Sequence, residues 1–333
     1  MTTSATEAAP SLQPPVAPGP ATPPRPAPPE WIAVTARRVL TAGFVLAIVT
    51  VAASIAGLAL DARVIAGAPA WLKPLKFGVS IAAYLLTIRW LLPLLPRRPR
   101  LLAAVSALLV VAFAVELALI ILQVVRGTTS HFNESTPFDQ MVFFTMGGFV
   151  GLLFVGTAVL AVLALRRGGS DPGTAWGIRL GLALCLLGML EAGLMIANRT
   201  ASSSGGHTVG AADGGPGLPI TDWSLDHGDL RIAHFAGLHA LQLLPLAAWA
   251  LARFTPLSAA LRVRLLAVVA GAYGVGVGLL AWQAERGQAL LRPDALTLGA
   301  VAALVVGAVA ATLVVLRAAR GVSPKPLQAN ARA

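Results

Sequence analysis

The sequence predicts an all-α, polytopic membrane protein: a helical bundle of about eight transmembrane helices with both termini in the cytoplasm. Of its 333 residues, 56% are hydrophobic and only 12% are charged. The mean hydropathy is +0.77, which excludes an ordinary soluble domain. Apolar runs long enough to cross a bilayer as helices recur along the chain. The runs are continuously apolar, whereas the strands of a membrane barrel would alternate.

The predicted elements follow one another along the chain. Residues 1–30 hold ten of the 24 prolines and almost no large apolar residue, which predicts a disordered cytoplasmic tail without the apolar core of a signal peptide. The bundle is expected over 31–320 and a second, basic cytoplasmic tail over 321–333. The eight spans are predicted near 39–60, 75–95, 101–125, 141–165, 174–197, 232–252, 262–283 and 295–317.

The net charge of +11 is distributed in a way that predicts the orientation. Basic residues gather at alternate helix ends, and the positive-inside rule places these ends in the cytoplasm. The lipid bilayer is then the expected partner, not a nucleic acid, and a bacterial cytoplasmic (inner) membrane is the expected location. A membrane protein partner or a homo-oligomer stays open. The basic groups are Arg37/Arg38, Arg97/Arg98/Arg100, Arg166/Arg167, Arg253/Arg262/Arg264 and Arg317/Arg320/Lys325.

The longest connection, 198–230, is expected at the outer end of the bundle. Its first part is rich in glycine and serine and reads as a linker, whereas its second part carries Trp223 among several turn-forming residues. Long loops in compact proteins are usually functional or disordered. The second part is therefore predicted to fold as a lid over the outer face.

All five histidines are predicted at this outer end. His227 lies between Asp226 and Asp229 and is expected to be solvated. The other four, which are the candidate metal ligands, are His131, His207, His234 and His239.

A short internal repeat relates two of these histidines. Spans three and five each end with a glutamate, an amide seven residues later, an arginine, a Ser/Thr run and a histidine. Seven residues are nearly two helical turns, so each glutamate shares a helix face with its amide. The pattern suggests two related helix pairs in a central four-helix core, with a site between them. Its two copies are Glu116–Gln123–Arg126–His131 and Glu191–Asn198–Arg199–His207.

Glu116 and Glu191 lie about two turns inside the outer interface. A carboxyl group within a membrane is costly, and such groups tend to be functional. They are the candidate catalytic or proton-carrying residues. The alternative is that each is protonated or bonds to a neighbouring helix.

The sixth span opens with Arg231, His234, His239 and Gln242. On a helix the two histidines lie about 140° apart, with Gln242 between them. One straight helix therefore cannot easily aim both at one ion, and the i,i+4 spacing of a helical zinc site is absent.

Two lysines, Lys73 and Lys76, stand at the outer start of the second span, against the positive-inside trend. They either snorkel to lipid phosphates or pair with a glutamate or an anionic ligand such as a propionate. The candidate cofactor-binding residues are Lys73, Lys76, Gln123, Arg126, Trp223, Arg231 and Gln242.

Several common mechanisms find no motif in the chain. Walker A, GxSxG, HExxH and CxxC patterns are all missing, which argues against ATP-driven transport by this chain alone and against serine or zinc hydrolysis of the known motif types. The single cysteine, Cys185, lies within the fifth span and allows no disulfide within one chain.

Two resemblances accompany these patterns. The strings Trp71–Phe77, Arg126–Asn133 and Asp226–Gln242 resemble those of a bacterial multi-pass membrane family without an assigned activity. Gly215-Pro-Gly217-Leu218, Trp223 and His234 or His239 are similar, in part, to haem A synthase, which binds haem through a histidine of its sixth span. The histidine of that family's eighth span and its paired outer-loop cysteines are missing here.

Three functions remain open from the sequence. The first is a redox or cofactor protein that holds haem, or a copper or iron ion, through the histidines; it would be a membrane oxidoreductase if it is an enzyme. The second is a proton-coupled secondary transporter that uses Glu116 and Glu191. The third is a non-catalytic assembly or sensor protein whose histidines respond to pH or metal.

Overall fold

The computed structural model describes residues 30–96, 98–166, 171–199 and 205–320. The tails predicted for 1–30 and 321–333 lie outside this part of the chain, except for Glu30. The helices and strands are α1 (Glu30–Leu60), β1 (Val64–Ile65), β2 (Ala68–Pro69), α2 (Leu72–Leu91), the 3-10 helix η1 (Leu92–Leu94), α3 (Pro99–Arg126), α4 (Pro137–Leu165), α5 (Pro172–Leu190), α6 (Ala192–Ala197), β3 (Thr208–Val209), β4 (Gly228–Asp229), α7 (Arg231–Phe254), α8 (Ala259–Glu285) and α9 (Ala295–Arg320).

The all-α membrane architecture is confirmed. The described residues contain eight helical segments that are long and apolar enough to cross a membrane, with α5 and α6 together forming one of them. Each begins and ends within about five residues of its predicted limits. Several helices start where the sequence supplies a proline in the first turn or a side-chain cap, as at Thr136, Asp171 and Ser258, whose oxygens accept a backbone N–H three residues later.

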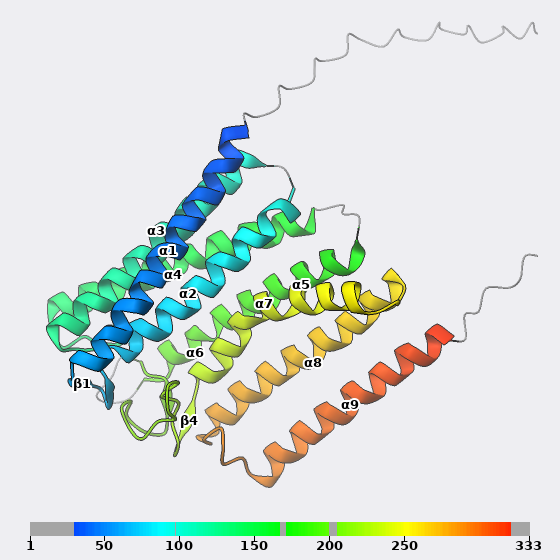
Figure 1. Cartoon of the computed structure of the whole chain (residues 1–333). Helices are drawn as coiled ribbons and strands as arrows, with labels where there is room; N and C mark the ends of the chain where they lie inside the picture. Colours follow the sequence, from blue (N-terminus) through cyan, green and yellow to red (C-terminus); the bar gives the residue numbers. More distant parts are fainter. Residues whose placement is uncertain (1–29, 97, 167–170, 200–204, 321–333) are drawn as a thin grey trace, which may run out of the picture.

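The helices pack in a chain of neighbours. α1 lies against α2 and α3, α3 against α4, α4 against α5, and α5 against both α7 and α8. α9 packs on α8 at the edge of the bundle and buries none of its most hydrophobic stretch (Figure 1). The largest apolar core runs through α1 to α5 and α7 and includes Leu85, Leu109, Leu182 and Leu241, all essentially inaccessible.

The sequence predicts the fifth span as one continuous helix, but Glu191 interrupts it between α5 and α6. Just before the interruption, α5 crosses α7 with glycine against glycine. A Cβ atom on Gly188 would lie 2.5 Å from the carbonyl carbon of Gly237, so neither helix tolerates a side chain there without moving.

Two short hairpins lie at one end of the bundle. β1 and β2 form an antiparallel pair, and β3 pairs with β4 across the long connection (Figure 1). The connections 61–71, 127–136, 205–230 and 286–294 all belong to this end, which we call the histidine-rich end. The opposite, arginine-rich end holds the start of α1 and the end of α9.

Candidate ligand-binding cavity at the histidine-rich end

A cavity of about 350 Å³ lies beneath the connections of the histidine-rich end. Its walls come from the start of α2, the loop after α3, the middle of α4, α6, the long connection and the start of α7. The apolar side chains on its walls include Phe77, Ile120, Phe132, Phe143, Met146, Met195 and Phe235. The charged and imidazole groups on its walls are Lys73, Lys76, His131, His207, Asp213, Asp222, Arg231 and His234. Six of the predicted site residues therefore meet in one place.

A two-part lid covers the cavity. The β1–β2 hairpin turns at Ala66 and Gly67, both at positive φ (47° and 78°), as a two-residue hairpin requires. Gly67 packs so closely against the carbonyl of Gly214 that a side chain there would clash. Lys76 Nζ donates a hydrogen bond of 2.8 Å to the carbonyl oxygen of Thr221. The long connection is thus held to both the hairpin and α2, and its second part lies over the bundle as predicted.

The three cations of the cavity have different partners. Arg231 binds the buried carboxylate of Asp229 at 2.7 Å and also contacts Asp222, and Lys76 is held by Thr221. Lys73 is repelled electrostatically by Lys76 and Arg231 and is attracted, more weakly, to Asp213 and Glu116. Within the described chain, however, no group makes a hydrogen bond or ion pair with Lys73 Nζ. Lys73 is therefore the cavity cation that is free to bind an anion.

The contacts of His234 define its tautomer. His234 Nδ1 lies 2.7 Å from the carbonyl oxygen of Gly188. A carbonyl only accepts hydrogen bonds, so Nδ1 carries the hydrogen and Nε2 keeps its lone pair in the neutral ring. His207 Nδ1 forms a hydrogen bond of 3.2 Å with Thr208 Oγ1, a hydroxyl that can donate or accept, and Asp213 Oδ1 lies at the same distance.

The loop histidines are neutral at pH 7. Burial, together with the nearby Arg231 guanidinium, lowers the pKa of His207 to about 4 against the opposing pull of Asp213 and Asp229. Burial lowers the pKa of His131 as well, and Lys73 adds to that effect. His131 packs its ring 5.7 Å from that of Phe77, with Nδ1 3.0 Å from Ser130 Oγ. The cavity thus offers uncharged imidazoles beside the amino group of Lys73, which has no hydrogen-bond or ion-pair partner among the described residues.

The two amides of the predicted repeat have the same role, which is to brace a histidine loop. Gln123 Nε2 donates to the carbonyl of Thr129 at 3.2 Å and to Asp139 Oδ1 at 2.8 Å. Asn198 Nδ2 donates to the carbonyls of Gly206 and Thr208 at 3.1 and 2.8 Å.

Arg126 completes the first brace by pairing with Asp139 at 2.5 Å. Gln123 and Arg126, predicted to bind a cofactor, therefore position the His131 loop and do not line the cavity.

Glu116 and Glu191 lie beside the cavity but not on its walls. Glu116 is 2% exposed, and neither of its carboxyl oxygens has a hydrogen-bond partner within the described residues. Glu191 Oε2 is likewise buried without a partner, and this side chain faces the like charge of Glu285. Two costly carboxyl groups are thus kept close to a ligand site.

Three predicted site features lie apart from the cavity. His239 is exposed on α7, with Nδ1 3.3 Å from Gln242 Oε1, so that helix turns it away from His234 as its spacing predicts. Trp223 belongs to the lid, where its carbonyl accepts a hydrogen bond from Leu218, but it does not line the cavity.

In the described ranges, no cluster of three or more His, Cys, Asp or Glu residues has the arrangement of a metal site.

Sequence reasoning missed three parts of the site: Asp213, Asp222 and the β1–β2 hairpin. The carboxylate of Asp213 accepts hydrogen bonds from the backbone N–H groups of His207 and Thr208 and so shapes the His207 loop. The Ala66-Gly67 pair between two short apolar stretches was the available signal for the hairpin.

Comparison with protein-family models, curated proteins and solved structures finds no match to this chain.

Proposed function

We propose that this multi-pass membrane protein binds a small organic anion with an apolar body in the cavity at its histidine-rich end. The observation that carries the proposal is Lys73, a cation on the cavity wall with no hydrogen bond or ion pair from the described residues, next to an aromatic and aliphatic lining. An unpaired ammonium in such surroundings is costly, and a bound carboxylate or phosphate would offset that cost.

The size and lining of the cavity support a ligand of this class. Its volume of about 350 Å³ is at the lower end of the range for small-molecule sites, which combine apolar walls with a few converging polar groups. The neutral ring of His234 presents an Nε2 lone pair, which would accept a hydrogen bond from a hydroxyl or amine of the ligand.

We propose that the protein captures the organic anion and does not conduct it through the bundle. The core beneath the cavity is filled by apolar side chains such as Leu85, Leu109 and Leu182. We place the cavity on the outer face of a bacterial cytoplasmic membrane, because the arginine-rich end is the cytoplasmic one under the positive-inside rule.

Labelling of single cysteines in intact cells tests this orientation. Cys185 is fully buried and is first replaced by alanine. A membrane-impermeant thiol reagent should then label a cysteine at Asp226 in the lid and not one at Ser258 between α7 and α8. The reverse pattern would place the cavity inside the cell.

The binding proposal is tested by titrating decanoate, a probe with one carboxylate and an apolar chain, into the detergent-purified protein by calorimetry. Lys73→Met keeps most of the unbranched side chain and removes the amino group. It should weaken binding about tenfold to hundredfold, since a charge-assisted hydrogen bond contributes about 1.5–3 kcal/mol. The matched control is Arg292→Gln, which removes an exposed cation of the same end, paired with Asp226. Uncharged 1-decanol measures the apolar contribution alone.

Haem is a second candidate, favoured by one observation. Metal-binding histidines usually donate their other ring N–H to a carbonyl or carboxylate, as His234 donates to the carbonyl of Gly188. His234 would hold the iron through Nε2, Lys73 and Lys76 would pair with the propionates, and the bound group would supply redox chemistry.

An absorption spectrum after addition of haem separates the two candidates. A Soret band that His234→Ala abolishes and His239→Ala leaves intact would support haem, because His239 faces away from the cavity. A spectrum identical to that of haem in detergent alone excludes it and leaves the organic-anion proposal standing.

A further inference from the structure

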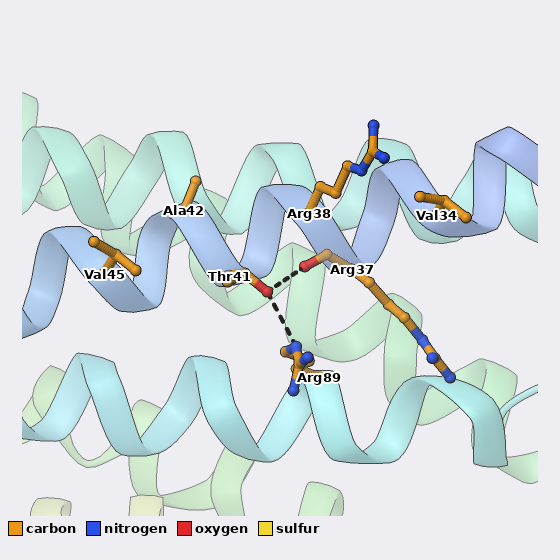
Figure 2. A pocket seen from close by; sticks show the side chains of 7 residues that line it. All are labelled: Val34, Arg37, Arg38, Thr41, Ala42, Val45 and Arg89. Carbon is orange, nitrogen blue, oxygen red and sulfur yellow. Dashed lines mark hydrogen bonds between the residues drawn. The ribbon is translucent and has the colours of Figure 1, made fainter.

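A second concave site lies at the arginine-rich end, between α1 and α2. This groove has a volume of about 690 Å³. It is lined by residues of three successive turns of α1 and by one residue of α2, which Figure 2 shows: Val34, Arg37, Arg38, Thr41, Ala42, Val45 and Arg89. The groove lies far from the cavity, because Arg89 is near the end of α2 whereas Lys73 is at its start.

The three arginines of the groove have no counter-charge among the residues that the structure describes. In the described part of the chain, no carboxylate forms an ion pair with Arg37, Arg38 or Arg89. By contrast, Arg262 at the same end binds Asp171 at 2.7 Å. Three unneutralised guanidinium groups within one groove create a local excess of positive charge that favours an anion.

One of these arginines is held in place. Arg89 Nε donates a hydrogen bond of 3.1 Å to Thr41 Oγ1, and Thr41 in turn donates to the carbonyl of Arg37 at 2.8 Å (Figure 2). The hydroxyl thereby fixes one edge of the Arg89 guanidinium and leaves its two terminal nitrogens for a ligand. A pre-oriented guanidinium loses less freedom when it binds, so the cost of binding is reduced.

The rest of the groove is apolar and exposed. Val34 and Val45 are 42% and 52% exposed. They mark the two ends of a stretch of α1 about 16 Å long, at 1.5 Å per residue. This combination of arginines and valines along a membrane-spanning helix suits a ligand with an anionic headgroup and acyl chains.

We propose that the groove between α1 and α2 binds the phosphate headgroup of an anionic phospholipid, with its acyl chains along the apolar face of α1. Guanidinium groups match phosphate oxygens in pairs, and basic pockets between membrane helices are a known type of lipid-binding site. This site is independent of the proposed function, because it shares no residue with the cavity.

The test is native mass spectrometry of the full chain in detergent, titrated with phosphatidylglycerol or phosphatidylcholine. The wild type should bind phosphatidylglycerol at least about tenfold more tightly. The double variant Arg37→Gln/Arg89→Gln should lose about 25-fold in phosphatidylglycerol affinity, at roughly fivefold for each arginine near a lipid surface. Its phosphatidylcholine affinity should not change.

The matched control is Arg98→Gln/Arg100→Gln, which removes two exposed arginines of the same end that do not line the groove. Its lipid affinity should stay within twofold of the wild type. Equal losses in both double variants, or a wild type without preference for the anionic lipid, would overturn the proposal. So would tight binding of glycerol 3-phosphate, because the groove would then recognise a free phosphate. The single variants Arg37→Gln and Arg89→Gln decide the matter if the double variant does not fold.

Discussion

Burial of the Glu116 carboxyl group lowers the stability of the folded protein. It is almost completely buried in α3, and its two carboxyl oxygens find no hydrogen-bond partner among the described residues. A buried polar group without a partner costs about 1–3 kcal/mol. Its position near Lys73 gives a reason to retain it, because it attracts the cation that we assign to the ligand.

Glu116→Met is therefore expected to stabilise the protein by about 1–3 kcal/mol, since it replaces an unsatisfied carboxyl group with an apolar side chain of similar size. The measurement is the thermal melting temperature in detergent. Glu134→Met, at an exposed carboxylate, should leave the melting temperature unchanged. A lower melting temperature for Glu116→Met would mean that the carboxyl group has a structural partner.

His207 makes the stability of the lid depend on pH. Its pKa is about 4 in the folded protein, against 6.5 for a free imidazole. Between these two values the unfolded chain binds more protons than the folded one, so stability is complete above about pH 6.5 and falls as the pH decreases towards 4. The full loss of folding stability is on the order of 3 kcal/mol, because the pKa differs by about 2.5 between the unfolded and folded protein and a difference of one corresponds to about 1.36 kcal/mol.

We expect the melting temperature to fall between pH 6.5 and 5, and His207→Gln to reduce the slope of that fall. The slope should not vanish, because the pKa of His131 is lowered as well. An unchanged slope in His207→Gln would show that the protonation of other groups controls the acid response.

At the scale of elements, the crossing of α5 and α7 supports the site. Gly188 lets the two backbones touch at Gly237, and its carbonyl fixes the ring of His234 at 2.7 Å. The apolar periodicity of the two spans predicts both helices, but it does not show which glycines face each other. That contact depends on how the helices are rotated, which the neighbouring helices determine.

Gly188→Ala should separate α5 from α7, lower stability by about 1–3 kcal/mol and weaken ligand binding through His234. Gly193→Ala is the matched control, because Gly193 lies one turn further, in α6, with open space around it. That control should be neutral or slightly stabilising, since alanine favours a helix more than glycine does. Equal effects of the two changes would argue that the crossing is not close-packed.

At the scale of the whole molecule, the sequence predicts the spans well and the site only in part. Apolar runs and flanking arginines mark the eight spans, because a bilayer imposes length and composition on each helix separately. The convergence of Lys73, His131, His207 and His234 could be expected only as far as all four lie at one end of the bundle. The lid that encloses them depends on contacts such as Gly67 with Gly214, which are distant in the sequence and follow no periodic pattern.

The positions of the histidines likewise depend on contacts that the sequence pattern does not show. A count places all five near one end of the bundle, but only three of them line the cavity, since His239 turns outward on α7 and His227 stays within the lid. The proposed function depends on Lys73, which lines the same cavity and has no hydrogen-bond or ion-pair partner among the described residues.

The most direct test of this account is the affinity of the purified protein for decanoate in the wild type, Lys73→Met and Arg292→Gln. The account predicts saturable binding to the wild type that is stronger than that of 1-decanol, a loss of about tenfold to hundredfold in Lys73→Met, and no change in Arg292→Gln. Equal affinity of the wild type and Lys73→Met, or equal affinity of the wild type for decanoate and 1-decanol, would contradict it.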